Sequence, residues 1–162
     1  MPKERFYADG LHFECTGCGN CCKLAGGFVY VTDDEIKAMA RYLKLSLTAF
    51  TDKYLDIHKS RYVLKSNGDA CILLENDACT VYPVRPVQCQ TFPFWSTNLK
   101  SKYRWRITQF ECEGIGQGRL YTKTEIENIV KMQSATDAGP SLVERKSQES
   151  SGSNEQSDSG TD

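Results

Sequence analysis

This sequence has no long apolar segment, almost no net charge and few histidines. Apolar runs such as Phe28–Val31 last only a few residues, whereas a membrane-spanning helix needs about 20 in succession, so we expect no membrane span. The 20 basic and 21 acidic side chains leave a net charge of −1, which points neither to nucleic acid nor to an acidic membrane surface. Met1–Phe6 lacks the apolar stretch of a secretory signal, and we expect a cytoplasmic protein.

The chain has 162 residues, enough for one domain with a hydrophobic core. Its composition changes near residue 137. Residues 137–162 hold six acidic and two basic side chains, a net charge of −4, and are rich in Ser and Gly without any aromatic residue. We therefore expect a folded domain at 1–136 and a disordered tail at 137–162.

Cysteine is the abundant exception, with eight residues against two histidines. The eight are Cys15, Cys18, Cys21, Cys22, Cys71, Cys79, Cys89 and Cys112. Disulfides are one interpretation of an even number of cysteines, and inert buried thiols are another. A reducing cytoplasm disfavours disulfides, and pairing among four cysteines within eight residues would remove little entropy from the unfolded chain. We therefore predict that all eight cysteines are metal ligands.

The first four cysteines lie in a short loop that suits metal binding. In Cys15-x2-Cys18-x2-Cys21 each two-residue spacer turns the next sulfur toward the same ion, and Gly17 and Gly19 supply the flexibility such turns need. Cys22 is adjacent to Cys21, so its side chain points elsewhere. The eight cysteines then form either two four-thiolate centres or one cluster that collects most of them.

All-sulfur coordination suits both zinc and iron–sulfur clusters, and the spacing alone does not choose between these cofactors. Several thiolates in one place carry negative charge that a cation or N–H groups must offset. Arg85 lies four residues before Cys89 and is our candidate for that cation, with Tyr82 as a hydrogen-bond donor to a ligand sulfur. Of the two histidines, His12 is a possible auxiliary ligand, whereas His58 lies in a polar stretch and is expected to be solvated.

The pattern of the remaining residues predicts an α+β fold of short strands and three or so helices around the metal centre. Capping boxes and apolar periodicity predict helices at 33–44 and 123–134, Ser46 begins a short helix, and another is expected within 83–90, near Pro86. Strands are predicted at 28–31 and 103–112, with a third in or near 6–14. Residues 61–82 are expected to form hairpins that place Cys71 and Cys79 side by side across one ladder.

Three groups of residues resemble a known family. They are Phe13-x-Cys15-x2-Cys18-Gly19-x-Cys21-Cys22, then Cys79-x2-Tyr82-x2-Arg85-Pro86-x2-Cys89-x2-Phe92-Pro93-Phe94, and finally Cys112-x-Gly114-Ile115-Gly116. Together they are similar to the CxxCxxCC cysteine-cluster proteins, also called YkgJ-like, over roughly residues 10–135. The resemblance implies zinc or iron chelation. The family commonly has Arg where this chain has Gln90.

Relatives of that family include flagellin lysine N-methylases, which join the same cysteine cluster to segments that this chain lacks, so the resemblance does not carry methyl transfer over. Three functions remain open. The first is an iron–sulfur or zinc protein acting in redox or metal-dependent catalysis. The second is a non-catalytic module that zinc stabilises, and the third is metal storage or delivery. Metal ions are the expected partners, and no catalytic residues are predicted.

Overall fold

The structure is a computed structural model that describes residues 3–24 and 27–137. Short antiparallel strand pairs alternate with helices, which confirms the predicted α+β class. The elements are β1 (Leu11–Phe13), 3-10 helix η1 (Asn20–Lys23), α1 (Asp33–Tyr42), α2 (Leu47–Tyr54), β2 (Leu55–His58), β3 (Arg61–Leu64), β4 (Ser66–Asn67), β5 (Ala70–Cys71), β6 (Leu74–Glu75), β7 (Ala78–Cys79), 3-10 helix η2 (Tyr82–Val84), α3 (Val87–Thr91), α4 (Lys102–Glu111), β8 (Ile115–Tyr121) and α5 (Lys123–Asp137).

The predicted tail at 137–162 lies outside the described residues, apart from Asp137 at the end of α5. Among residues 3–24 and 27–137, no helix combines the length and the apolar character that crossing a membrane requires.

The helices α1, α2 and α5 begin where the sequence predicts. The Thr32 hydroxyl accepts the Glu35 N–H at 3.3 Å and the Glu35 carboxylate accepts the Thr32 N–H at 2.7 Å, which completes the capping box of α1. The other Glu35 oxygen accepts the Val87 N–H at 2.8 Å, so the same side chain fastens α3 to α1. Ser46 caps α2, and a second capping box, Thr122 with Glu125, begins α5.

Apart from β1–β8, the strand pairs of the described residues are local hairpins. The strands β2 and β3 pair through a turn at Lys59 and Ser60, both at positive φ, and the strand predicted at 28–31 is only a bridge between Tyr30 and Val63. The predicted pairing of the two hairpin cysteines is wrong. Cys71 faces Ser66 in β4–β5 and Cys79 faces Leu74 in β6–β7, because the chain forms two tight hairpins in succession rather than one longer ladder.

The strand predicted at 103–112 is also wrong, because these residues form α4. Ser101 caps the helix by accepting the Arg104 N–H at 3.1 Å. The buried side chains Trp105 and Thr108 recur at helical spacing, while Phe110 is 92% exposed. The aromatic residues that suggested a strand therefore divide between the two faces of a helix.

Strand β1 pairs with β8 and joins two distant cysteine segments. The Glu14 N–H donates to the Gly114 carbonyl at 3.0 Å. A Cβ at Gly114 would stand 2.0 Å from the Glu14 carbonyl oxygen, so only glycine allows this approach. The contact brings Cys15, the next residue after Glu14, toward Cys112.

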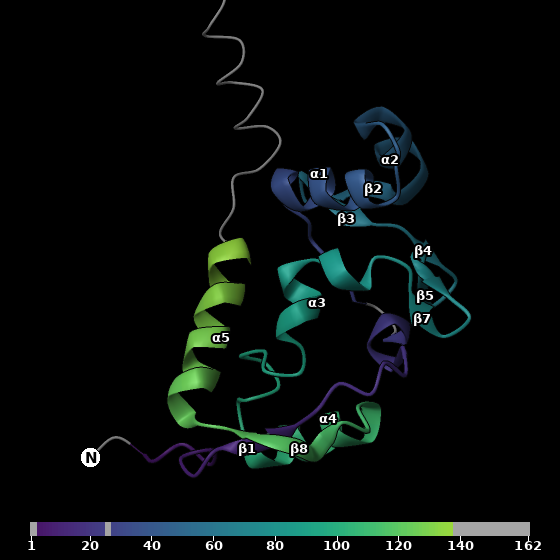
Figure 1. Cartoon of the computed structure of the whole chain (residues 1–162). Helices are drawn as coiled ribbons and strands as arrows, with labels where there is room; N and C mark the ends of the chain where they lie inside the picture. The colour runs from purple at the N-terminus through teal and green to yellow at the C-terminus, as the bar shows by residue number, and fades with distance from the viewer. Residues whose placement is uncertain (1–2, 25–26, 138–162) are drawn as a thin grey trace, which may run out of the picture.

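Two hydrophobic cores support the fold. The first core contains Met39, Phe50 and Val81 and unites α1, α2 and the hairpins; the second contains Phe94, Trp105 and Ile126 and unites α4, β8 and α5. Figure 1 shows these groups toward opposite ends of the molecule, with α3 between them. The cysteines reach the space between the two cores from both sides: Cys71 and Cys79 pack on the first core and Cys112 belongs to the second.

Candidate metal centre

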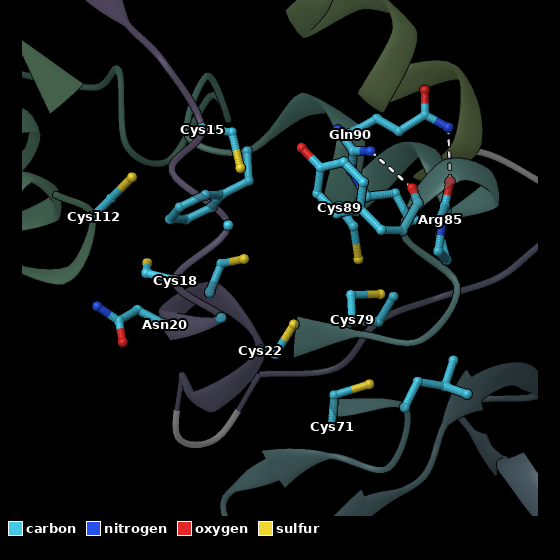
Figure 2. Close-up of a pocket in the computed structure, with 18 of the residues that line it drawn as sticks. Cys15, Cys18, Asn20, Cys22, Cys71, Cys79, Arg85, Cys89, Gln90 and Cys112 are labelled. Atoms are coloured by element: carbon cyan, nitrogen blue, oxygen red, sulfur yellow. Dashed lines mark hydrogen bonds between the residues drawn. The ribbon is translucent and has the colours of Figure 1, made fainter. Parts of the chain in front are cut away.

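The structure gathers all eight predicted ligands around one open hollow. The loop after β1 contributes the first four cysteines, the ends of β5 and β7 contribute Cys71 and Cys79, α3 contributes Cys89, and the C-terminal end of α4 contributes Cys112. All eight are free thiols, so the disulfide alternative is not realised in the structure. Figure 2 shows the labelled cysteine side chains around the open space.

The rest of the wall is mainly apolar. Phe13, Phe92 and Trp95 supply aromatic rings, and Trp95 is fixed because its indole N–H donates to the Gln88 carbonyl at 2.9 Å. Phe92 and Phe94 belong to the second core, and Trp95 packs against it. Four aliphatic side chains, Val29, Leu64, Leu73 and Val81, complete this lining. Such a wall lowers the local polarity around any bound metal.

The eight thiols line the same hollow, but they do not converge on the position of a single metal ion. In the part of the chain that the structure describes, no three Cys, His, Asp or Glu side chains converge as the ligands of one ion. Four sulfurs bound to one zinc at about 2.3 Å would lie within about 4 Å of one another. The donor set therefore fits a soft metal chemically, and its spread is wider than one tetrahedral ion requires.

Glycine fixes the course of the cysteine loop against the hairpins. Gly19 adopts φ 74° and a Cβ there would lie 2.5 Å from the Asp77 carbonyl oxygen, so the loop lies directly on the β6–β7 turn. The Cys22 N–H donates to the Gly19 carbonyl at 3.1 Å and begins η1. An ion pair between Lys23 and Asp77 joins the same two segments, and Thr16 donates to Glu113 at 2.6 Å.

Cys21 and Cys22 form an asymmetric pair. The Cys22 thiol donates a hydrogen bond to Cys21 and lowers the pKa of Cys21 to about 7, with smaller help from backbone N–H groups and the Arg85 charge. The pKa of Cys22 is raised, first because its proton is held in that hydrogen bond and then by burial. The adjacent thiols therefore differ in how readily they ionise before any metal binds.

Burial makes four further thiols harder to ionise. Desolvation raises the pKa of Cys71, Cys79, Cys89 and Cys112, because a thiolate is less stable away from water. The positive charge of Arg85 opposes this rise at Cys79 and Cys89. A cation that bound here would supply the missing charge and displace the protons.

Arg85 and Tyr82 lie together at the wall. The guanidinium carbon of Arg85 stands 4.0 Å from the centre of the Tyr82 ring, and its Nη1 donates to the Tyr82 carbonyl at 2.9 Å. The Tyr82 hydroxyl hydrogen-bonds to Cys15 and its pKa is raised, chiefly by that bond. Gln90 donates to the Arg85 carbonyl at 2.7 Å, and Figure 2 draws this hydrogen bond as a dashed line. The bond holds the backbone of Arg85 in place.

Histidine does not contribute to the hollow. Its lining contains neither His12 nor His58. The His12 Nδ1 instead pairs with the Gly118 carbonyl at 2.9 Å. His58 was expected to be solvated, but it stacks on Phe28 at 3.8 Å and pairs with the Tyr30 hydroxyl at 2.9 Å.

Sequence reasoning missed other residues of the wall. Phe13 and Glu111 line the hollow, and each lies one or two residues from a cysteine, which is the signal that could have indicated them. Leu73 and Val81 lie two residues after Cys71 and Cys79 and are almost fully buried. Their shared spacing from a cysteine was also visible in the sequence.

A family model named CxxCxxCC, described as "Putative zinc- or iron-chelating domain", matches residues 14–113. This span contains all eight cysteines. The chain belongs to the CxxCxxCC family. The resemblance found in the sequence is thereby confirmed, and metal chelation by a cysteine cluster is the property that the family implies for this hollow.

Two proteins of Methanocaldococcus jannaschii are similar to this CxxCxxCC chain. The uncharacterized protein MJ0939 is 26% identical over 125 residues, covering 74% of this chain and 43% of the relative. The uncharacterized protein MJ0661 is 30% identical over 92 residues, covering 54% of this chain and 48% of the relative. The chain therefore spans less than half the length of each. No solved structure matches this chain.

Proposed function

We propose that this protein binds a polynuclear thiolate-ligated metal centre in the cysteine hollow, an iron–sulfur cluster before zinc. The observation that carries the proposal is the arrangement of the eight thiols. They line one hollow, yet no three described side chains converge on a single ion. Bridging sulfide between irons would fill such a gap, because a cluster places its metals apart and lets each thiolate bind its own iron.

The surroundings of the thiols support an anionic cluster. Arg85 lies in the wall and lowers the cost of thiolate charge at Cys79 and Cys89. Backbone N–H groups favour the thiolate form at Cys71, Cys79 and Cys112, and Tyr82 hydrogen-bonds to Cys15. Hydrogen bonds to sulfur and apolar walls are the means by which proteins tune the potential of such centres.

When bound, the centre would supply one-electron transfer or a Lewis-acidic metal. The chain's own residues would do the rest. The cysteines bind the metals, Arg85 offsets their charge, and the rings of Phe13, Phe92 and Trp95 limit the access of water to the interior. The described residues suggest no separate set of catalytic groups, so we assign no reaction.

Two features favour a second candidate, a structural zinc site or a metal carrier. The hollow lies between two hydrophobic cores, so a metal there would join them and add folding free energy. Cys15 and Cys21 are exposed, which suits exchange of metal with another molecule. Under either function the free thiols fit a reducing compartment such as the cytoplasm, and we propose a metal-binding domain at 1–136.

The test is elemental analysis together with an absorption spectrum of protein prepared without oxygen. We expect a brown protein that contains iron and acid-labile sulfide and absorbs near 400 nm, roughly as thiolate-ligated iron–sulfur clusters do. A colourless protein with about two zinc ions and no sulfide would replace the cluster by the zinc alternative. Protein without either metal would contradict both.

A further inference from the structure

Two successive hairpins repeat the same cysteine unit. Asp69-Ala70-Cys71 ends the first and Asp77-Ala78-Cys79 ends the second, eight residues later. In each hairpin the cysteine faces the residue five positions earlier. The next N–H also repeats, because Ile72 donates to the Lys65 carbonyl at 3.0 Å and Thr80 to the Leu73 carbonyl at 2.9 Å. The two sulfurs are therefore carried by equivalent backbone.

The residue two positions after each cysteine anchors the unit. Leu73 is 2% exposed and Val81 is fully buried in the first core. The N–H of Leu73 hydrogen-bonds to the sulfur of Cys71, and the N–H of Val81 does the same for Cys79. Each cysteine therefore lies in a short segment whose last residue is buried in the first core.

Cys112 is held in a similar way by the second core. Gly114 and Ile115 direct their backbone N–H groups at its sulfur. Ile115 is 4% exposed and Cys112 itself 9%, and Gly114 is pressed against Glu14. In all three segments a backbone N–H two residues ahead contacts the sulfur, and the core anchor is that same residue in the hairpins and the next residue, Ile115, after Cys112.

Cys15 has a different environment. It is exposed, and the 3-10 turn that follows it contains no buried residue. Its partner is the hydroxyl of Tyr82, a side chain that is itself 41% exposed. Cys15 itself belongs to neither core, so its sulfur can leave a metal with little effect on the packing of the cores.

We infer that Cys71, Cys79 and Cys112 are the fixed ligands of the centre and Cys15 is an exchangeable one, whose place an external anionic ligand can take. The inference rests on the proposed metal centre and adds a division among its ligands. It makes the centre a binding site beside the exposed side chains of Cys15 and Tyr82, rather than a sealed structural element.

Arg85 gives the chemical class of the external ligand. Across residues 3–24 and 27–137, no carboxylate forms an ion pair with Arg85. Its Nη1 bonds the Tyr82 carbonyl, which leaves other guanidinium N–H groups for a ligand. With Tyr82 beside it, Arg85 suits a small anion, such as a carboxylate, that reaches the metal as Cys15 withdraws.

Alkylation of the metal-loaded protein tests the division directly. The protein is treated with iodoacetamide without oxygen, and the modified cysteines and the retained metal are measured by mass spectrometry. We expect Cys15 to be modified at least about tenfold faster than the three fixed ligands, with the metal retained. Equal protection of Cys15, or loss of metal in step with its modification, overturns the inference.

Variants and an anion probe complete the test. Cys15→Ser is expected to keep its metal while the matched Cys79→Ser loses it; similar losses in both contradict the division. Azide is the probe, because its infrared stretching band shifts when it binds a metal. We expect a shifted band in Cys15→Ser. The band should be weaker in the double variant that also carries Arg85→Gln. Absence of that band in Cys15→Ser rejects the exchangeable position, whereas wild-type protein without any metal rejects the proposed function itself.

Discussion

The cysteine loop and the tandem hairpins offer thiols to the same hollow by opposite means. The loop around Cys15–Lys23 buries no residue in its turn η1 and is held by glycine geometry and exposed polar contacts. The hairpins hold Cys71 and Cys79 through Leu73 and Val81, which are embedded in the first core. The difference teaches that one half of the site is preorganised by folding, and the other half depends more on the metal for its order.

Removing the metal should expose that difference most strongly. Because a bound metal would join the two cores and fix the loop, a chelator with reductant should lower the melting temperature by about 10 °C or more, since 1 kcal/mol corresponds to about 2–4 °C at this size. Calorimetry measures the shift. Hydrogen exchange should rise in the loop more than in the hairpins, and equal loss of protection in both would remove the distinction.

The core anchor of the first hairpin should be the next largest effect. Leu73→Ala removes a side chain that is 2% exposed and should lower the free energy of unfolding by about 2–5 kcal/mol. Urea denaturation of the metal-free protein measures this change without the contribution of the metal. Ile72→Ala, a neighbour that is only half-buried, is the control and should cost clearly less.

The loop can be tested by a pair of glycines. Gly19→Ala should lower the free energy of unfolding by about 1–3 kcal/mol and reduce metal retention, because φ is 74° and the new Cβ meets the Asp77 carbonyl. Gly17→Ala is the matched control, since φ is 70° but no atom lies within 4 Å of its Cβ. Equal effects would show that strain alone, not contact with the hairpin, decides the cost.

The two regions should also differ in their response to pH. In metal-free protein the alkylation rate of Cys21 should be half-maximal near pH 7, because its pKa is lowered to about 7 by the Cys22 thiol. Cys71 and Cys79 should become reactive at a higher pH than Cys21, since burial raises their pKa values. Peptide mapping measures each rate. In Cys22→Ala the Cys21 midpoint should move upward, and an unchanged midpoint would exclude the hydrogen bond as its cause.

The smallest effect should come from the exposed ion pair. Lys23→Met breaks the contact with Asp77 that crosses from loop to hairpin. Because both side chains face solvent, we expect no measurable change in the urea midpoint and at most a salt-dependent change in metal off-rate. A stability loss as large as that of Gly19→Ala would mean that charge, rather than backbone fit, holds the loop.

Much of the site could be predicted from the sequence, because all of its candidate metal ligands are cysteines. Eight cysteines with this spacing predict a metal site whatever the fold, and the capping boxes of α1 and α5 are local signals that the structure confirms. The course of the chain between cysteines was less accessible. Cys71 and Cys79 were expected on one ladder, but two tight turns separate them.

The error at α4 has a physical reason as well. Aromatic and β-branched residues are typical of strands, yet Trp105 and Thr108 lie on one face of a helix while Phe110 points to solvent. Tertiary packing of Trp105 in the second core decides the outcome. Local propensity carries no information on that contact, because its partners, Phe6 and Phe94, lie elsewhere in the chain.

X-ray absorption at the metal edge of protein prepared without oxygen tests the central claim most directly. The account predicts a first shell composed of sulfur at about 2.3 Å, together with a metal–metal signal that reports more than one metal in the hollow. A first shell made mainly of nitrogen or oxygen, or a single isolated metal without a neighbouring metal, would contradict it.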